Sequence, residues 1–372
     1  MTYTELKIRL MQQGAEFTSD ARKRMCRSKF GQIAFYDYAT TGGIVIEIDG
    51  QVYANVPVRF QYSDFRVDFG QDEFLLFFHE ERLPVQVRII PVPKYALDAV
   101  RLEDGTPVRE VVMTHADRVR ISPVHGCSFH CNYCTCNSST YRELTREQLD
   151  AAFRIALNDS YNTPRHVLIS GGTPKEKEDS YTWLNDIYHY FPNAYPKLDF
   201  DVMLSPRTFM PGQEISSGYD IFLRFLHDDC GVKTMSVNLE LYNESLRKKY
   251  IPEKYSIGMD QYELFIKNAV AVFGEGNIRS SLIVGLESSE DTLQGVKALV
   301  DWGCIPVLSA FVPAPGTEGA TMPAPEAAFL LDVVERANNI ASLANSRLGP
   351  ICRPCTHNSI TWENGFIQTS TS

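Results

Sequence analysis

The sequence of 372 residues contains no run of about 18 uncharged apolar residues, so we expect no membrane-spanning helix. The first residues, Met1 to Glu16, carry scattered charges and no apolar core followed by small residues, which is unlike a signal peptide. A cytoplasmic protein is therefore expected. Basic residues are outnumbered, since 36 Lys and Arg against 46 Asp and Glu give a net charge of −10. This balance disfavours binding to nucleic acid or to an anionic membrane, because both require a basic surface.

The nine cysteines are odd in number and unevenly spaced along the chain. In a chain without an export signal, this pattern does not predict a disulfide framework. Thiols that cluster in a reducing compartment indicate metal or redox chemistry instead.

Residues 1–115 are predicted to form a small α+β module whose role the sequence does not reveal. An amphipathic helix is expected within residues 3–14. A β-hairpin is expected over residues 43–58, because Asp49-Gly50 is a favourable two-residue turn between two apolar runs. Further strands are expected at residues 65–69, 73–79 and 85–92.

From Asp117 onward, short apolar runs alternate with longer helical stretches, which is the pattern of β/α units around a parallel sheet. Thr145 with Gln148, and Ser288 with Asp291, are typical of helix starts. A long helix over residues 325–348 is expected to stop at Gly349-Pro350. Six strands are predicted, fewer than the eight of a complete barrel: residues 118–122, 166–170, 198–204, 234–239, 278–284 and 306–312. We therefore predict an α/β barrel domain over residues 116–348 and a C-terminal extension over residues 349–372.

Three cysteines follow the first predicted barrel strand in the segment HGCSFHCNYCTC, where Cys127, Cys131 and Cys134 have C-x3-C-x2-C spacing. A short loop can wrap three thiolates around a four-iron cluster and leave the fourth iron without a protein ligand. A structural zinc site is the alternative, but it needs four ligands. His130 or Cys136 would have to supply the fourth.

With Tyr133 directly before its last cysteine, this motif resembles the defining motif of the radical S-adenosylmethionine (SAM) superfamily. The resemblance covers about residues 117–316. It implies a partial (β/α)6 TIM-like barrel, which agrees with the six strands predicted independently. It also implies a [4Fe-4S] cluster whose open iron chelates SAM, and one electron that breaks a carbon–sulfur bond to give a 5′-deoxyadenosyl radical.

Paired glycines end the second predicted strand in Gly171-Gly172-Thr173-Pro174. Glycines at the carboxyl end of a parallel strand let the backbone approach a ligand closely. The segment resembles the glycine motif of the superfamily, which implies contact with the amino group of SAM.

Asn238 and Glu240 are expected on one face of the fourth strand, because side chains alternate along a strand. Polar side chains inside a barrel need partners, so a ligand is one explanation. Pairing with each other or with Arg279 is the other. The pair resembles the biotin-synthase-like branch, where such residues reach the SAM ribose and the substrate.

The remaining strand ends resemble the same branch with two departures. The sixth strand leads into a P-A-P-G-T turn like that of the branch, which implies that the backbone near Val312 lies by adenine. The first departure is Ser281, which stands where the branch has glycine in the fifth strand. The second concerns an arginine. No residue between 247 and 262 aligns with the arginine that holds the SAM carboxylate in relatives. Lys254, or Arg207 in the segment that begins at Ser205, is the predicted substitute.

Cys352 and Cys355 form a C-x2-C pair beyond the final helix. They could support an auxiliary iron-sulfur cluster or a zinc ion, or remain reduced thiols. Two thiolates are too few for either metal site alone. The residues considered for completing the set are His357, Cys136, Cys304 and Cys230.

The resemblance predicts a radical SAM enzyme that abstracts hydrogen from a small organic or amino-acid-like substrate. Glu240 and Arg279 are the polar barrel residues expected to meet that substrate, and a flavodoxin or ferredoxin is the expected electron donor. Three alternatives stay open. The substrate could be a peptide or other macromolecule recognised by residues 1–115 through strand addition, or the chain could be a non-catalytic iron-sulfur redox protein or a zinc-stabilised binding protein.

Overall fold

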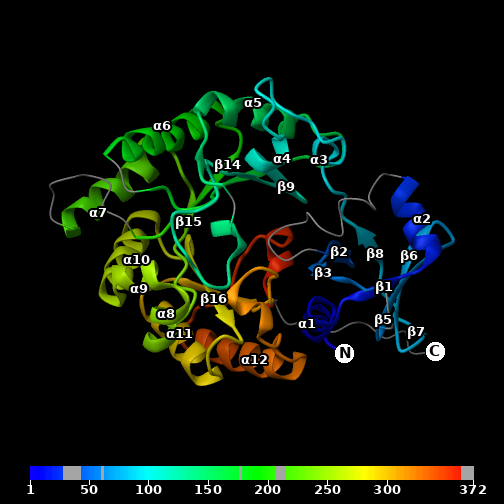
Figure 1. Cartoon of the computed structure of the whole chain (residues 1–372). Helices are drawn as coiled ribbons and strands as arrows, with labels where there is room; N and C mark the ends of the chain where they lie inside the picture. Colours follow the sequence, from blue (N-terminus) through cyan, green and yellow to red (C-terminus); the bar gives the residue numbers. More distant parts are fainter. Residues whose placement is uncertain (28–42, 60–62, 139, 176–177, 207–214, 362–372) are drawn as a thin grey trace.

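The computed structural model describes residues 1–27, 43–59, 63–138, 140–175, 178–206 and 215–361. A seven-stranded sheet forms the wall of a partial barrel (Figure 1), in the order β17-β16-β15-β14-β13-β10-β9. All neighbouring strands are parallel except β9 and β10. The bounds are β9 Val112–His115, β10 Arg118–Ile121, β13 His166–Ile169, β14 Asp199–Met203, β15 Thr234–Ser236, β16 Ile278–Val284 and β17 Ile305–Ala310.

The predicted α/β class and partial (β/α)6 TIM-like barrel are confirmed, and each of the six predicted strands is present. One strand was not foreseen. β9 lies before the predicted boundary at residue 116, yet it pairs with β10 and extends the barrel sheet by an antiparallel edge strand.

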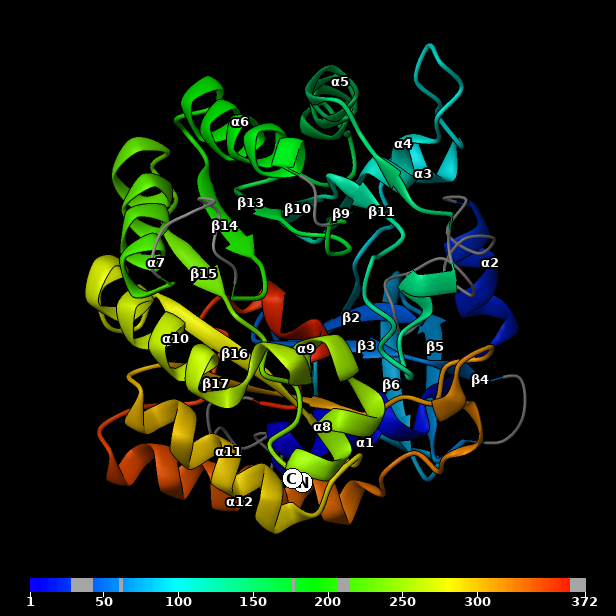
Figure 2. The ribbon, with the colours of Figure 1, turned by 60° about the vertical axis from the view of Figure 1, so that its left-hand side comes forward.

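Helices cover the outer face of the barrel sheet (Figures 1 and 2). The long ones are α5 Arg146–Leu157, α6 Glu178–Ala194, α7 Ile215–Arg224, α10 Met259–Phe273, α11 Ser289–Asp301 and α12 Ala327–Leu343. Shorter elements fill the connections: α3 Lys94–Leu97, α4 Val108–Val111, β11 Val124–His125, β12 Arg142–Glu143, α8 Glu244–Tyr250 and α9 Pro252–Ile257. The capping box at Thr145 and the Ser288 cap form as predicted.

The last long helix ends earlier than predicted, at Leu343 instead of residue 348. Asn345 adopts a left-handed backbone with φ of 54°, and the Ser346 amide donates to the Ala341 carbonyl at 2.8 Å. Asparagine is one of the few residues that accept this conformation, which commonly ends helices. The stop signal was therefore Asn345, not Gly349-Pro350.

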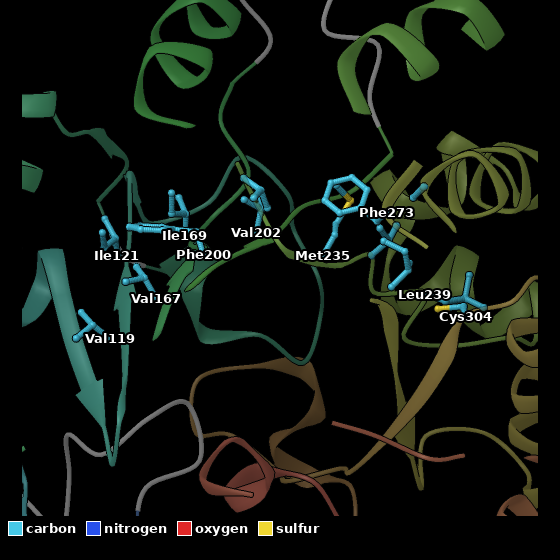
Figure 3. Packing of buried hydrophobic residues seen from close by; sticks show 14 of the residues in the cluster. Val119, Ile121, Val167, Ile169, Phe200, Val202, Met235, Leu239, Phe273 and Cys304 are labelled. Carbon is cyan, nitrogen blue, oxygen red and sulfur yellow. The ribbon is translucent and has the colours of Figure 1, made fainter. Parts of the chain in front are cut away.

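The two faces of the barrel strands differ in polarity. Apolar side chains such as Val119, Ile121, Val167 and Ile169 point to the helices and join one large buried cluster (Figure 3). The alternate positions carry polar groups, listed here from β10 to β16: Arg118, Arg120, His166, Asp201, Thr234 and Arg279. Charged and polar side chains therefore gather toward the amino ends of these strands, on the face turned away from the helices.

The N-terminal module is an eight-stranded sheet with helices α1 Tyr3–Gln13 and α2 Ser19–Arg27. Its main path is β3-β2-β8-β6-β5-β1-β4, and β7 pairs with β6. Asp49 and Gly50 both have positive φ, 53° and 66°, in the tight turn between β2 and β3, so the predicted hairpin is confirmed. The strands are β1 Ala15–Phe17, β2 Ile44–Ile48, β3 Val52–Val56, β4 Val58–Arg59, β5 Phe65–Gly70, β6 Glu73–Phe78, β7 Glu81–Arg82 and β8 Val87–Ile89.

The N-terminal module and the C-terminal segment, residues 349–361, both pack against the barrel. Ile8, Val45 and Tyr53 belong to the same buried cluster as the barrel core. The C-terminal segment runs along the edge strand β17, where the Ile360 amide donates to the Leu308 carbonyl at 2.8 Å. Its 3-10 turn, Pro354–Asn358, contacts β3. The module and this segment thus lie at the open side of the partial barrel (Figure 1).

None of the helices in the described ranges is both long enough and apolar enough to span a bilayer.

Candidate functional site

A cavity of about 420 Å³ lies at the carboxyl ends of β13, β14 and β15. Ligands bind at this end of the strands in parallel α/β barrels. The cavity gathers most of the residues predicted from the sequence, although they come from four separate parts of the chain. These are Cys127, Cys131, Tyr133, Cys134, Gly171, Gly172, Thr173, Pro174, Ser205, Asn238 and Glu240.

Backbone amides point at the sulfur atoms of the cysteine loop that follows β11. The Sγ of Cys127 accepts from the Thr173 amide at 3.1 Å and from the Phe129 amide at 3.4 Å. The Sγ of Cys134 accepts from the Cys136 amide at 3.5 Å. Hydrogen bonds of this kind stabilise charged sulfur and tune sulfur ligands of metal clusters.

The glycine turn after β13 is pressed against the cysteine loop. A Cβ atom on Gly172 would lie 1.6 Å from the Gly126 carbonyl oxygen, so no other residue fits there without displacing the backbone. The Ser128 amide donates to the Thr173 carbonyl, and the Ser128 hydroxyl to the Pro174 carbonyl, both at 2.9 Å. Gly172 is therefore needed for close approach of the two loops, in addition to any contact with a ligand.

The opposite side of the cysteine loop is fixed by Asn132. Its amide donates to the Tyr250 carbonyl at 2.9 Å, and its side-chain Nδ2 donates to the Lys249 carbonyl at 2.8 Å and to Glu318 at 2.9 Å. The loop is thus held from two sides of the barrel mouth, which fixes the positions of the three thiols.

The spread of the three sulfurs fits a cluster better than a single ion. The sulfurs of Cys127, Cys131 and Cys134 do not all lie within 4.8 Å of one another, whereas the donor atoms of one other group of three side chains in the described residues do. Two thiolates on one tetrahedral zinc lie only about 3.7 Å apart, given a bond length of about 2.3 Å. The cysteine loop is therefore too open for one zinc ion and suits ligands to separate irons of a [4Fe-4S] cluster.

The residues considered for a fourth zinc ligand have other contacts. His130 is 72% exposed, and its Nδ1 lies 2.9 Å from a carboxylate oxygen of Glu253. Cys136 lines the cavity, with its amide directed to Cys134.

Glu240 is the centre of a buried polar network beside the cysteines. Its carboxylate accepts from the Tyr133 hydroxyl and forms an ion pair with Lys254, whose side chain is 11% exposed. Burial by itself lowers the pKa of Lys254, but the adjacent Glu240 carboxylate outweighs it, so the pKa is raised above its usual value. Lys254 therefore stays charged across the physiological range.

The backbone at Glu240 is strained, since its φ of 68° is rare for a residue other than glycine. Two hydrogen bonds to β16 hold it there: the Glu240 amide donates to Ser281, and the Ile283 amide donates to Glu240, both at 2.8 Å. Strain that the surroundings enforce is a feature of functional sites. The turn directs the carboxylate into the cavity although β15 already ends at Ser236.

Asn238 and Glu240 both line the cavity but neither pairs with Arg279. The Oδ1 of Asn238 accepts from the Ser281 amide at 3.2 Å, and its Nδ2 lies 3.5 Å from the sulfur of Met203. Arg279 forms an ion pair with Asp201 instead.

Two predicted site residues lie apart from the cavity lining in the described part of the chain. Arg279 is near the amino end of β16, where its guanidinium contacts Asp201 and Thr234. Val312 is 43% exposed beyond the end of β17. Contact of Arg279 with substrate, and of the Val312 backbone with adenine, stay predictions.

Of the two substitutes predicted for the carboxylate-binding arginine, Lys254 lines the cavity. Ser205 and Lys254 both line the cavity, and Lys254 is already paired with Glu240. Arg207 lies outside the described residues.

Arg118 and Arg120 are lumen residues that the sequence reasoning missed. The Nε atoms of both are buried and have no hydrogen-bond partner in the ranges that the structure describes. The alternation Arg-Val-Arg-Ile in β10 was the available signal, because it puts both arginines on the face opposite the buried Val119 and Ile121.

No protein-family model matches the sequence, and no curated protein matches it. Several solved structures are similar to it. A radical SAM methyltransferase from Sphaerobacter thermophilus is 17% identical, with 67% of this chain and 70% of that chain covered and a TM-score of 0.49. SuiB from Streptococcus suis, bound to S-adenosylmethionine, is 13% identical, with 67% and 54% covered and a TM-score of 0.48.

HydG, a maturase of the [FeFe]-hydrogenase, is 14% identical, with 64% of this chain and 52% of that chain covered and a TM-score of 0.43. The chain thus spans about half the length of SuiB and HydG. Of these three similar structures, the first is described as a radical SAM enzyme.

Proposed function

We propose that this chain is a radical SAM enzyme in which Cys127, Cys131 and Cys134 hold a [4Fe-4S] cluster. The observation that carries the proposal is their arrangement: the three thiols border one cavity at the carboxyl ends of the strands, and their sulfurs are too far apart to share a single ion. An electron carrier would need the cysteines but not the adjoining cavity.

SAM is the ligand that we assign to this cavity, whose 420 Å³ lie in the range of small-molecule sites. Cys127, Cys131 and Cys134 would hold the cluster, and its chemistry would be the one-electron reduction of SAM to methionine and a 5′-deoxyadenosyl radical able to take hydrogen from substrate. The protein provides binding, orientation and exclusion of water.

Each part of the cavity suits one part of SAM. The backbone carbonyls of the turn Gly171–Pro174 can accept from the amino group, because Gly172 brings that turn against the cysteine loop. The Glu240 carboxylate and the Asn238 amide can bind ribose hydroxyls. Ser205, and Lys254 if it shifts from Glu240, can bind the carboxylate.

The substrate that we favour is a small organic or amino-acid-like molecule. Apolar side chains from β13, α6, β14 and the residue after β14 line one side of the cavity: Ile169, Leu184, Tyr188, Met203 and Leu204. For a peptide bound by strand addition, one edge of the N-terminal sheet is β3, which already contacts the turn Pro354–Asn358. A low-potential donor of the flavodoxin or ferredoxin class, in a reducing cytoplasm, would supply the electron.

The test is SAM cleavage by the full chain, reconstituted anaerobically with iron and sulfide and reduced with dithionite. We expect 5′-deoxyadenosine from the wild type and none above background from Cys134→Ala. Cys136→Ala is the matched control, since this neighbouring thiol is not a proposed ligand, and it should retain the cluster. A colourless protein that contains zinc without iron, or equal product from Cys134→Ala, would contradict the proposal.

A further inference from the structure

A second group of metal-ligating side chains lies at the other end of the barrel. The donor atoms of His166, Cys352 and Cys355 are all within 4.8 Å of one another. The Nε2 of His166 is 3.0 Å from the Sγ of Cys355 and 3.6 Å from the Sγ of Cys352. His166 is the first residue of β13, whereas the cavity is lined by residues that follow the last residue of β13. The two sites therefore lie at opposite ends of this strand.

The turn that carries the two cysteines is already ordered for binding. The Cys355 amide donates to the Sγ of Cys352 at 3.3 Å, in the manner of amides that stabilise metal-bound thiolates. Lys7 of α1 donates to the Thr356 carbonyl at 2.7 Å, and the His357 Nδ1 lies 2.8 Å from the Pro354 carbonyl. The turn is therefore fixed from the N-terminal module and by its own side chains.

The distances fit one ion and not a cluster. Bonds of about 2.3 Å to sulfur and about 2.0 Å to imidazole place N and S about 3.5 Å apart on a tetrahedral ion. The two observed separations, 3.0 and 3.6 Å, lie around this value. In an auxiliary iron-sulfur cluster each ligand would bind a separate iron, which would hold the His166 Nε2 and the two sulfurs farther apart than these separations.

The surroundings also suit a pair of thiolates. Burial, together with the nearby Arg118 guanidinium, lowers the pKa of both His166 and His357, and Arg118 has no ion pair among the described residues. Its positive charge can offset the negative charge of two thiolates bound to a divalent cation.

We propose that His166, Cys352 and Cys355 form a mononuclear site for a zinc-class divalent cation, with the fourth position open to water or an exogenous ligand. Two thiolates and one imidazole are a ligand set that zinc accepts. The site would join the C-terminal segment, which runs along β17, to the amino end of β13.

The structure shows the oxidised form, in which Cys352 and Cys355 are joined by a disulfide. A dithiol reductant delivers two electrons and two protons to this bond and is itself oxidised to a disulfide. The divalent cation then displaces the two thiol protons and binds both sulfurs and the His166 Nε2. The site is therefore metal-binding only when reduced.

The test uses cobalt(II) as the probe and the full chain with Cys127, Cys131 and Cys134 changed to serine, so that the proposed cluster site cannot contribute. After reduction by a dithiol, we expect one cobalt per chain with thiolate-to-cobalt charge-transfer absorption. Cys352→Ser and His166→Ala should each weaken binding at least tenfold. His189→Ala, an exposed histidine of α6, should leave the titration unchanged. Equal absorption after Cys352→Ser would overturn the site.

A second measurement applies if the chain with Cys127, Cys131 and Cys134 changed to serine fails to fold. In the reconstituted wild type, purified anaerobically with excess metal removed, we expect one zinc per chain that Cys352→Ser abolishes without changing the iron count. Loss of iron, instead of zinc, on Cys352→Ser would overturn the mononuclear site in favour of an auxiliary cluster. Both readouts are independent of SAM cleavage, so failure here is distinguishable from failure of the proposed function.

Discussion

At the scale of single residues, Gly172 is the position in the site that is least tolerant of substitution. A Cβ there would meet the Gly126 carbonyl oxygen at 1.6 Å and the Cys127 Cα at 2.7 Å. We expect Gly172→Ala to push the cysteine loop away from β13, with a loss of about 1–3 kcal/mol in the free energy of unfolding and of most of the bound iron.

Iron content and urea unfolding measure these two effects. Gly70→Ala is the matched control, because the nearest atom to a Cβ there is 3.8 Å away and its φ is not positive. Wild-type iron content in Gly172→Ala would contradict the close approach of the two loops.

Glu240 and Lys254 are expected to depend on each other. Removing one member of a buried ion pair costs about 3–5 kcal/mol, because the other charge stays buried without its partner. Glu240→Ala should show a loss of this order in urea unfolding of the metal-free chain. The double variant Glu240→Leu with Lys254→Met should lose much less than the sum of the single variants. Additive losses would show that the two charges do not stabilise each other.

At the scale of elements, α1 is joined to the C-terminal segment by a buried lysine. The Lys7 ammonium donates to the carbonyls of Thr356 and Thr361, and burial lowers its pKa to about 7 from 10.5. Between these two pH values the unfolded chain binds a proton that the folded chain lacks. The free energy of unfolding should therefore rise with pH in this window, by at most about 1.4 kcal/mol per pH unit from this residue.

Urea unfolding from pH 7 to 10 checks this slope, with Lys7→Met as the comparison. The titratable neighbour His357 stays neutral in this range, because burial lowers its pKa to about 3. The variant should lose Lys7's share of the slope, so its stability relative to the wild type should fall as the pH rises from 7 to 10. Identical slopes in both proteins would contradict the burial of a titrating ammonium.

Most elements could be predicted from the sequence because their signals are local. The capping box at Thr145 and the Asp49-Gly50 turn depend on residues within a few positions of each other, and both formed as expected. The end of α12 was wrong because Asn345, a weaker stop signal than glycine followed by proline, acts first.

At the scale of the whole molecule, the contacts that could not be predicted join residues far apart in the chain. The order of strands predicted that the cysteines, the glycines and Glu240 share one end of the barrel. It did not predict that Tyr133 and Lys254 meet on Glu240, or that His166 lies beside Cys355, since no local pattern encodes the partner of a side chain. The packing of β3 and α1 against the C-terminal segment could not be predicted for the same reason.

The central claim is that three cysteines hold a cluster with one iron open to SAM. The most direct measurement is the electron paramagnetic resonance spectrum of the reduced, reconstituted chain with and without SAM. We expect the signal of a reduced [4Fe-4S] cluster whose g values shift when SAM is added, and loss of that signal in Cys134→Ala but not in Cys136→Ala. A signal that SAM leaves unchanged, or the same signal in Cys134→Ala, would contradict the account.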